Sequence, residues 1–238
     1  MSLALSLAVI TFIATFTQSV AGFGMALVAM PMLTAGILPL EIAAPLVALI
    51  GSVGRPLMIL KYRSALTFSH VSVLLLSSVI AIPLGVDLLK IVDEQIIRTV
   101  LAMVVIGYVV LTLLLEKLPS LEHPAWAYGL GFIGGLLAGA YNIGGPPAVI
   151  YATGRKWLAD EFRANLQTYA LVNSGVVLFA HFREGNLTLE VLQLFVWSVP
   201  ALILGLSLGF VLNERINQDV FRKLVLILFL ITGVRLLL

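Results

Sequence analysis

The chain has 238 residues, of which 61% are hydrophobic and only 11% are charged, and its mean hydropathy is +1.10. Soluble domains are about half apolar and about a quarter charged, so this composition indicates an integral membrane protein and leaves no room for a soluble catalytic domain. The net charge of +2 does not indicate a nucleic-acid partner, and a chain without cysteine forms no disulfides or thiolate metal sites.

Ten apolar runs are predicted to be helices, because barrel strands would alternate apolar and polar residues over about 10 positions and these runs do not. In chain order the runs cover residues 3–20, 25–38, 42–60, 71–89, 96–115, 125–141, 148–157, 164–182, 191–212 and 220–238. The first run lacks the basic residues that open a signal peptide and leads into more apolar sequence. We therefore expect it to remain as a membrane helix.

Two of the predicted helices, 25–38 and 148–157, are short and follow glycine-rich breaks. The breaks are Gly22-Phe23-Gly24 and Asn142-Ile143-Gly144-Gly145-Pro146-Pro147. One straight helix over residues 3–38 would be about 54 Å long, whereas the hydrocarbon core of a bilayer is about 30 Å thick. Each region is therefore predicted to be two helices that meet at a break, in a hairpin that re-enters the membrane or crosses it twice.

The spacing of the two breaks indicates an internal duplication. A shift of 120 residues places Gly24 on Gly144 and Arg63 on Arg183, and the arginine match carries more weight in a chain with so few charges. The predicted domains are therefore two transmembrane repeats, residues 1–115 and 125–238, joined by a polar linker over residues 116–124.

The distribution of basic residues predicts the orientation in the membrane. If each broken region is a single crossing, the 14 Lys and Arg residues divide six against eight. If each is a hairpin, they divide ten against four, the four being Lys90, Arg98, Arg183 and Arg235. Positive charge gathers in cytoplasmic loops, so the hairpins are preferred and both termini are predicted to lie outside, on the periplasmic side. The expected fold class is all-α integral membrane, with two inverted-topology repeats that each contain a broken-helix hairpin and three transmembrane helices.

The breaks also mark the predicted binding site, because irregular backbone survives inside a membrane only where it lines a cavity or is packed by protein. The helices that follow Gly24 and Gly145 each present unpaired N–H groups and a positive dipole end, which favour a bound anion. The predicted substrate-binding backbone therefore comprises Gly22, Gly24, Met25, Gly144 and Gly145. The alternative is that these glycines serve only close helix packing.

Few polar side chains remain within the apolar runs. Gln18 and Asn142 are candidate donors to an oxyanion, or they tie a frayed helix end to a neighbour. Arg55 and Asn173 are candidate pathway residues, although Arg55 can instead extend toward the membrane interface. Arg163 is expected at the inner mouth of the pathway, where it either collects anions or follows the positive-inside bias.

Catalytic motifs are not found. Ser174 and His181 lie seven residues apart, which is about 10 Å along a helix and too far for a base to reach its nucleophile. The sequence contains no HExxH motif and no phosphate-binding glycine loop that ends in Lys-Ser or Lys-Thr. We therefore expect no enzyme activity, no cofactor and no metal site.

Two motifs resemble those of a known family. Gly22-Phe23-Gly24 leading to Pro31, and the second break followed by Phe162-Arg163-Ala164, resemble the TauE/SafE family of sulfite and organosulfonate transporters over essentially the whole chain. The resemblance implies transport of small sulfur-containing anions, such as sulfite or sulfoacetate, across a bacterial inner membrane. It also implies binding roles for the break residues, with Phe23 as an apolar wall or gate. Met25 departs from a glycine-richer first-half pattern, which leaves room for a different pocket shape and substrate.

Together, the residues and the resemblance predict a secondary transporter that passes a sulfite or organosulfonate through a site between the two halves. Export is the expected direction, because an inside-negative potential favours the exit of an anion by about 2.3 kcal/mol per charge per 100 mV. The expected partners are that anion and the lipid bilayer, and a homodimer is kept open. The alternative is a membrane assembly subunit that transports nothing and whose breaks serve packing.

Overall fold

The computed structural model describes residues 3–114, 120–213 and 215–237, and within these ranges every regular element is a helix. The first half contains α1 (Leu3–Ala21), α2 (Met25–Thr34), α3 (Leu40–Tyr62), the short 3-10 helix η1 (Arg63–Ala65), α4 (Phe68–Ile91) and α5 (Glu94–Leu114). The second half contains α6 (Pro124–Tyr141), α7 (Gly145–Gly154), α8 (Ala159–Arg183), α9 (Leu189–Leu212) and α10 (Gln218–Leu237). The predicted all-helical class is confirmed.

The helix ends differ from the predicted ones where polar residues or turns intervene. α8 begins at Ala159, before the apolar run starts at residue 164, and its first turn carries Asp160 and Glu161. Acidic residues in a first turn are favoured by the positive end of the helix dipole, so the helix extends beyond its apolar part. α2 ends at Thr34 rather than at residue 38, because the chain turns through Gly36.

The predicted linker, residues 116–124, lies partly outside the described residues, since 115–119 are not among them. Its described part packs against the end of α7. Leu121 is buried, and its N–H donates to the carbonyl of Gly154 at 3.1 Å. α6 then begins at Pro124, where the side chain of His123 accepts a hydrogen bond from the N–H of Ala125.

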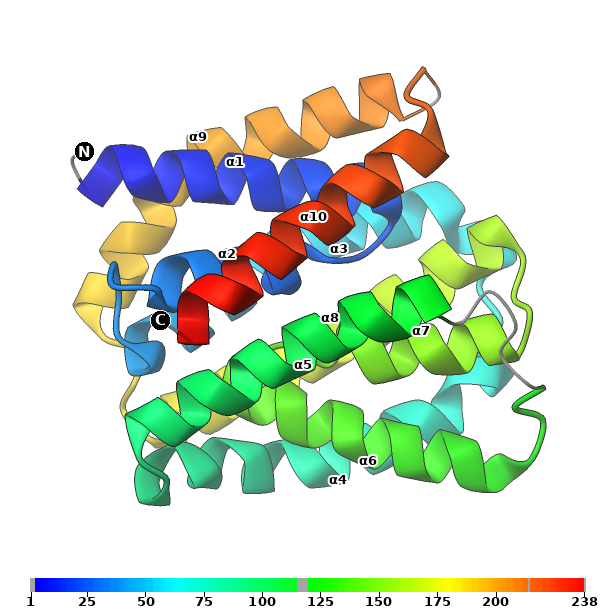
Figure 1. Cartoon of the computed structure of the whole chain (residues 1–238), viewed down its shortest axis with the longest axis horizontal. Helices are drawn as coiled ribbons and strands as arrows, with labels where there is room; N and C mark the ends of the chain where they lie inside the picture. Colours follow the sequence, from blue (N-terminus) through cyan, green and yellow to red (C-terminus); the bar gives the residue numbers. More distant parts are fainter. Residues whose placement is uncertain (1–2, 115–119, 214, 238) are drawn as a thin grey trace.

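The first break is a glycine turn between α1 and α2. Gly22 and Gly24 have φ angles of +79° and +98°, in the left-handed region where a residue with a Cβ is strained. The N–H of Gly22 still bonds to the carbonyl of Gln18 at 2.8 Å, which closes the last turn of α1. α1 and α2 then pack against each other instead of continuing as one rod (Figure 1).

The second break is capped by an asparagine. Asn142 has a φ of +55°, and its N–H donates to the carbonyl of Ala138 at 2.8 Å. Asparagine is the residue, besides glycine, that most often takes this conformation at a helix C-terminus. Pro146 and Pro147 follow in the first turn of α7, where a missing N–H costs no helical hydrogen bond. α6 and α7 also pack against each other.

Small residues bring two pairs of helices into close contact. On α6, Gly131, Gly135 and Gly139 recur every fourth residue and face the backbone of α4, so that a Cβ at any of them would collide with a carbonyl of α4. On α9, Gly205 and Gly209 face α1 in the same way. These glycines have the packing role that is common in membrane bundles.

The helix pairs are arranged around a central pair. α1 packs along α9 at one edge of the molecule and α4 packs along α6 at the opposite edge, as Figure 1 shows. α3 and α8 pack against each other between these edges, and α5 pairs with α10. The last turn of α1, the first turns of α2 and α7, and the middle of α8 are thereby brought toward the centre.

Four helical segments within the described ranges are long and apolar enough to cross a membrane by length and composition: Leu3–Ala21, Leu40–Ala65, Phe68–Leu88 and Leu189–Leu212. This supports a multi-pass membrane protein. α8 is not one of them, although it has 25 residues, because it carries buried polar residues such as Asn165, Gln167 and Asn173. α8 packs against both α3 and α4. Polar residues on such an enclosed membrane helix are expected to line a binding site or a transport pathway.

Candidate functional site

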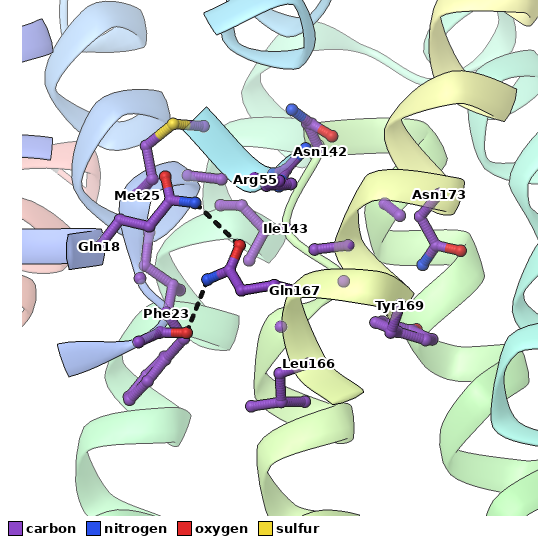
Figure 2. Close-up of a pocket in the computed structure, with 18 residues that line it drawn as sticks. Gln18, Phe23, Met25, Arg55, Asn142, Ile143, Leu166, Gln167, Tyr169 and Asn173 are labelled. Carbon is purple, nitrogen blue, oxygen red and sulfur yellow. Dashed lines mark hydrogen bonds between the residues drawn. The ribbon is translucent and has the colours of Figure 1, made fainter. Parts of the chain in front are cut away.

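A cavity of about 60 Å³ lies where the two breaks meet α3 and α8 (Figure 2). One buried water needs about 10–15 Å³ on this measure, so the cavity has room for about four to six waters or a small ion. Its lining comes from both breaks and from helices of both halves: Gln18, Gly22, Phe23, Gly24, Met25, Ala26, Leu27, Arg55, Ala138, Asn142, Ile143, Gly144, Gly145, Leu166, Gln167, Tyr169, Ala170 and Asn173.

Two helix N-termini line this cavity, and they differ in the number of backbone N–H donors that they offer. Met25, Ala26 and Leu27 line it at the start of α2, and N–H groups in a first turn have no partner inside the helix. α7 contributes Gly145, but the next two residues are prolines and carry no N–H. α2 therefore supplies most of the backbone donors, together with the positive end of its dipole.

Arg55 places a positive charge at the cavity. Its side chain is only 5% exposed, folds back over Gly51, and donates from Nη1 to the Oγ of Ser174 on α8. No Asp or Glu of the described residues forms an ion pair with Arg55, and none lines the cavity. A buried charge without a counter-ion is costly, so this site favours an anion.

A pair of glutamines connects α8 to the first break. The amide Nε2 of Gln167 donates to the carbonyl of Gly22 at 2.7 Å, and the amide Nε2 of Gln18 donates to Oε1 of Gln167 at 3.0 Å. Both bonds are drawn as dashed lines from Gln167 in Figure 2. The Oε1 of Gln18 is buried and has no hydrogen-bond partner in the described part of the chain.

Two asparagines extend the polar lining. The Oδ1 of Asn142 accepts a hydrogen bond from Ser174 Oγ at 3.5 Å, and the Nδ2 of Asn173 donates to Ser78 Oγ at 2.8 Å. Ser78 Oγ is also hydrogen-bonded to the hydroxyl of Tyr169 at 3.0 Å. The remaining amide atoms, Asn142 Nδ2 and Asn173 Oδ1, are buried and unpartnered within the described ranges. Unpaired polar atoms beside a cavity are typical of a ligand site.

Phe23 forms an apolar wall of the cavity. Its ring lies edge-on to Phe162 of α8 and to Tyr108 of α5, with centroid distances of 6.0 and 6.2 Å. Tyr108 in turn contacts Phe229 of α10 at 6.1 Å. This row of rings connects the first break to three helices, so Phe23 is held in place by its neighbours.

All eight residues that the sequence predicted to bind substrate line the cavity: Gln18, Gly22, Phe23, Gly24, Met25, Asn142, Gly144 and Gly145. Arg55 and Asn173, predicted along the pathway, line it as well. Arg163 lies beside the first break but is not part of the lining. Its stem packs against Gly22, and its guanidinium lies 5.3 Å from the ring of Tyr62 and 3.4 Å from the carboxylate of Asp160.

Of the α8 residues that line the cavity, sequence reasoning identified only Asn173 and missed the others, above all Gln167 and Tyr169. Gln167 and Ser174 lie seven residues apart, a spacing that places them on one face of a helix. Polar residues on one face of an otherwise apolar run were the signal that could have identified Gln167.

The chemistry of the cavity lining suits an anion better than a cation. The cavity combines one guanidinium with amide groups and the backbone donors of α2, and no carboxylate or imidazole lines it. Across the described residues, no cluster of three or more His, Cys, Asp or Glu residues could hold a metal ion.

The model of one protein family, described as "Sulfite exporter TauE/SafE", matches residues 7–236. The matched range contains every residue of the cavity. No curated protein and no solved structure matches the chain.

Proposed function

Because the chain belongs to the TauE/SafE sulfite exporter family, whose members are membrane transporters rather than enzymes, we propose that it moves a small sulfur oxyanion through the cavity between the breaks. The observation that carries this proposal is Arg55, a buried cation without an acidic partner among the described residues. The guanidinium supplies the charge, and the first turn of α2, which lines the same cavity, supplies N–H groups that have no partner inside the helix.

The cavity volume favours the smallest anions of the class. A volume of about 60 Å³ accommodates an ion the size of sulfite, which has four non-hydrogen atoms. An organosulfonate such as sulfoacetate is about twice as large and would require the cavity to widen. Sulfite is therefore the substrate that we propose, with organosulfonates as secondary candidates.

The pairing of helices supports our proposal that the two halves are inverted repeats. If α1 to α5 correspond to α6 to α10, the contact between α1 and α9 corresponds to the contact between α6 and α4. In the same scheme α3 corresponds to α8 and α5 to α10, and the two helices of each of these pairs contact each other. A two-fold axis between the halves produces this pattern, and transporters with such repeats place their substrate at the repeat interface.

We propose export across a bacterial cytoplasmic membrane, with both termini outside. The inside-negative potential drives an anion outward without ATP. The start of α1 and the end of α10 lie at the same end of the molecule in Figure 1, as this orientation requires.

The test is sulfite flux in proteoliposomes that contain the purified protein. Arg55→Met is expected to lower the flux roughly ten- to a hundredfold, because a hydrogen bond to a charged group contributes about 1.5–3 kcal/mol. Arg55→Lys keeps the charge but not the planar geometry, so an intermediate flux is expected. Arg183→Met, which removes an exposed arginine from the end of α8, is the matched control and is expected to retain flux.

Absence of flux from the unaltered protein, under gradients of either direction, would contradict transport. It would favour the alternative function, an assembly subunit of the membrane. Equal flux from Arg55→Met and the unaltered protein would remove Arg55 from the anion site.

A further inference from the structure

The hydrogen bonds around the first break have a defined direction. The carbonyl of Gly22 can only accept, so the group of Gln167 that lies 2.7 Å from it must be the amide nitrogen. The oxygen of Gln167 therefore faces Gln18, and Gln18 must donate to it through its own nitrogen, at 3.0 Å. The oxygen and nitrogen of a glutamine amide are hard to tell apart from their positions alone. Here the carbonyl oxygen of Gly22 decides which atom is which in both glutamines.

As a consequence, the oxygen of Gln18 is the free end of this chain of bonds. Gln18 lines the cavity and is 2% exposed, and its Oε1 has no partner in the part of the chain that the structure describes. In Figure 2 this oxygen lies on the side of the Gln18 amide away from Gln167. Gln18 therefore adds a buried, unpartnered hydrogen-bond acceptor to the wall of the cavity, in addition to the donors of Arg55 and α2.

An acceptor in an anion site distinguishes between forms of an anion. A fully deprotonated oxyanion has only acceptor atoms, so an oxygen placed against Gln18 Oε1 meets another lone pair. An oxyanion that retains one proton offers a donor for Gln18 and acceptors for Arg55 and the N–H groups of α2.

The charge of the cavity agrees with this distinction. The lining contains one cationic side chain, Arg55, and no carboxylate, so a single negative charge balances it. A sodium ion at the free oxygen of Gln18 is disfavoured, because it would share the cavity with the guanidinium and find no anionic ligand in the lining.

We propose that the cavity selects singly charged oxyanions that carry a hydrogen-bond donor, hydrogensulfite among them, over anions of similar size without one. Gln18 is the specificity-determining residue, and Gln167 and the carbonyl of Gly22 are the groups that orient it. This inference rests on the proposed function, since it concerns which form of the anion the same cavity accepts.

The test compares two inhibitors of sulfite flux in proteoliposomes at one pH. Sulfamate and methanesulfonate each carry one negative charge and have the same number of non-hydrogen atoms, but sulfamate has an amino group where methanesulfonate has a methyl group. Sulfamate is expected to inhibit at about a tenfold lower concentration, the ratio that one hydrogen bond provides. Equal inhibition by the two compounds would overturn the inference.

A pair of variants assigns the preference to Gln18. Gln18→Met keeps the length of the side chain but removes the acceptor, so it is expected to make the two inhibitors equally effective. Gln193→Met makes the same exchange at an exposed position on α9 and is expected to keep the tenfold preference. A preference that survives in Gln18→Met would overturn the role of Gln18.

Two further outcomes remain interpretable. If Gln18→Met shows no flux, the melting temperature of the purified variant is measured with each inhibitor, and a larger rise with sulfamate than with methanesulfonate would overturn the role of Gln18. If the unaltered protein shows no sulfite flux at all, the proposed function fails and this inference fails with it. Flux without an inhibitor preference contradicts the inference alone.

Discussion

Individual glycines in this chain have two different roles, and their surroundings decide which. Gly135 on α6 faces the backbone of α4, where a Cβ would collide with the carbonyl of Ser78. At Gly145 a Cβ would have no atom within 4 Å, and this residue lines the cavity. Gly144 is intermediate, because a Cβ there would lie 2.9 Å from the carbonyl oxygen of Gly134. Gly145 is therefore the position at which the cavity can be filled without disturbing a helix contact.

Gly145→Leu is expected to abolish sulfite flux and to leave the protein folded, because Gly145 lines the cavity and a Cβ there meets no other atom within 4 Å. The flux is measured in proteoliposomes and the fold by the melting temperature in detergent. Gly129→Leu is the matched control, since Gly129 is exposed on α6 and also has open space where a Cβ would lie. Retained flux in Gly145→Leu would exclude the cavity from the transport pathway.

At the scale of elements, α8 differs most from an ordinary membrane helix. It packs against α3 and α4, its Gln167 and Asn173 line the cavity, and its Ser174 accepts a hydrogen bond from Arg55. The neighbouring pair, α4 and α6, has the opposite character, because glycines bring its two backbones together. Polar contacts of α8 thus line the cavity, whereas the neighbouring pair of α4 and α6 is held together by close backbone packing.

Gly135→Ala is expected to destabilise the pair formed by α4 and α6, because the added Cβ meets the backbone of Ser78, which cannot move aside cheaply. Overpacking of this kind costs about 1–3 kcal/mol, so the melting temperature in detergent should fall. Gly129→Ala, on the same helix but facing open space, should leave it unchanged. Equal melting temperatures for the two variants would contradict the packing role of Gly135.

At the scale of the whole molecule, the predicted orientation in the membrane rests on the distribution of the basic residues between the two sides of the membrane. The ten-to-four division of the 14 Lys and Arg residues belongs to the arrangement with both termini outside. A tag on either terminus should therefore be digested when protease is added to intact spheroplasts, and a tag in a cytoplasmic control protein should be protected. Protection of both tags would reverse the predicted orientation.

The sequence was sufficient for the helices and for the location of the breaks. Long apolar runs can only be helices or barrel strands in a membrane, and these runs lack the alternation of strands. Gly24, Asn142 and the two prolines act on the backbone locally, so their effect can be read without knowledge of the neighbours. Every residue that was predicted at a break on this local basis lines the cavity.

Only the tertiary structure decided which partners these residues have. Arg55 meets Ser174 across 119 positions of the chain, and Gln18 meets Gln167 across 149. No local pattern indicates such pairs, because they depend on α3 packing against α8 and on the first break lying beside both. The charge of Arg55 and the amide of Gln18 are properties of the sequence. The way the helices pack decides that Arg55 is buried without an acidic partner among the described residues. It also decides that the oxygen of Gln18 is left without a partner in the wall of the cavity.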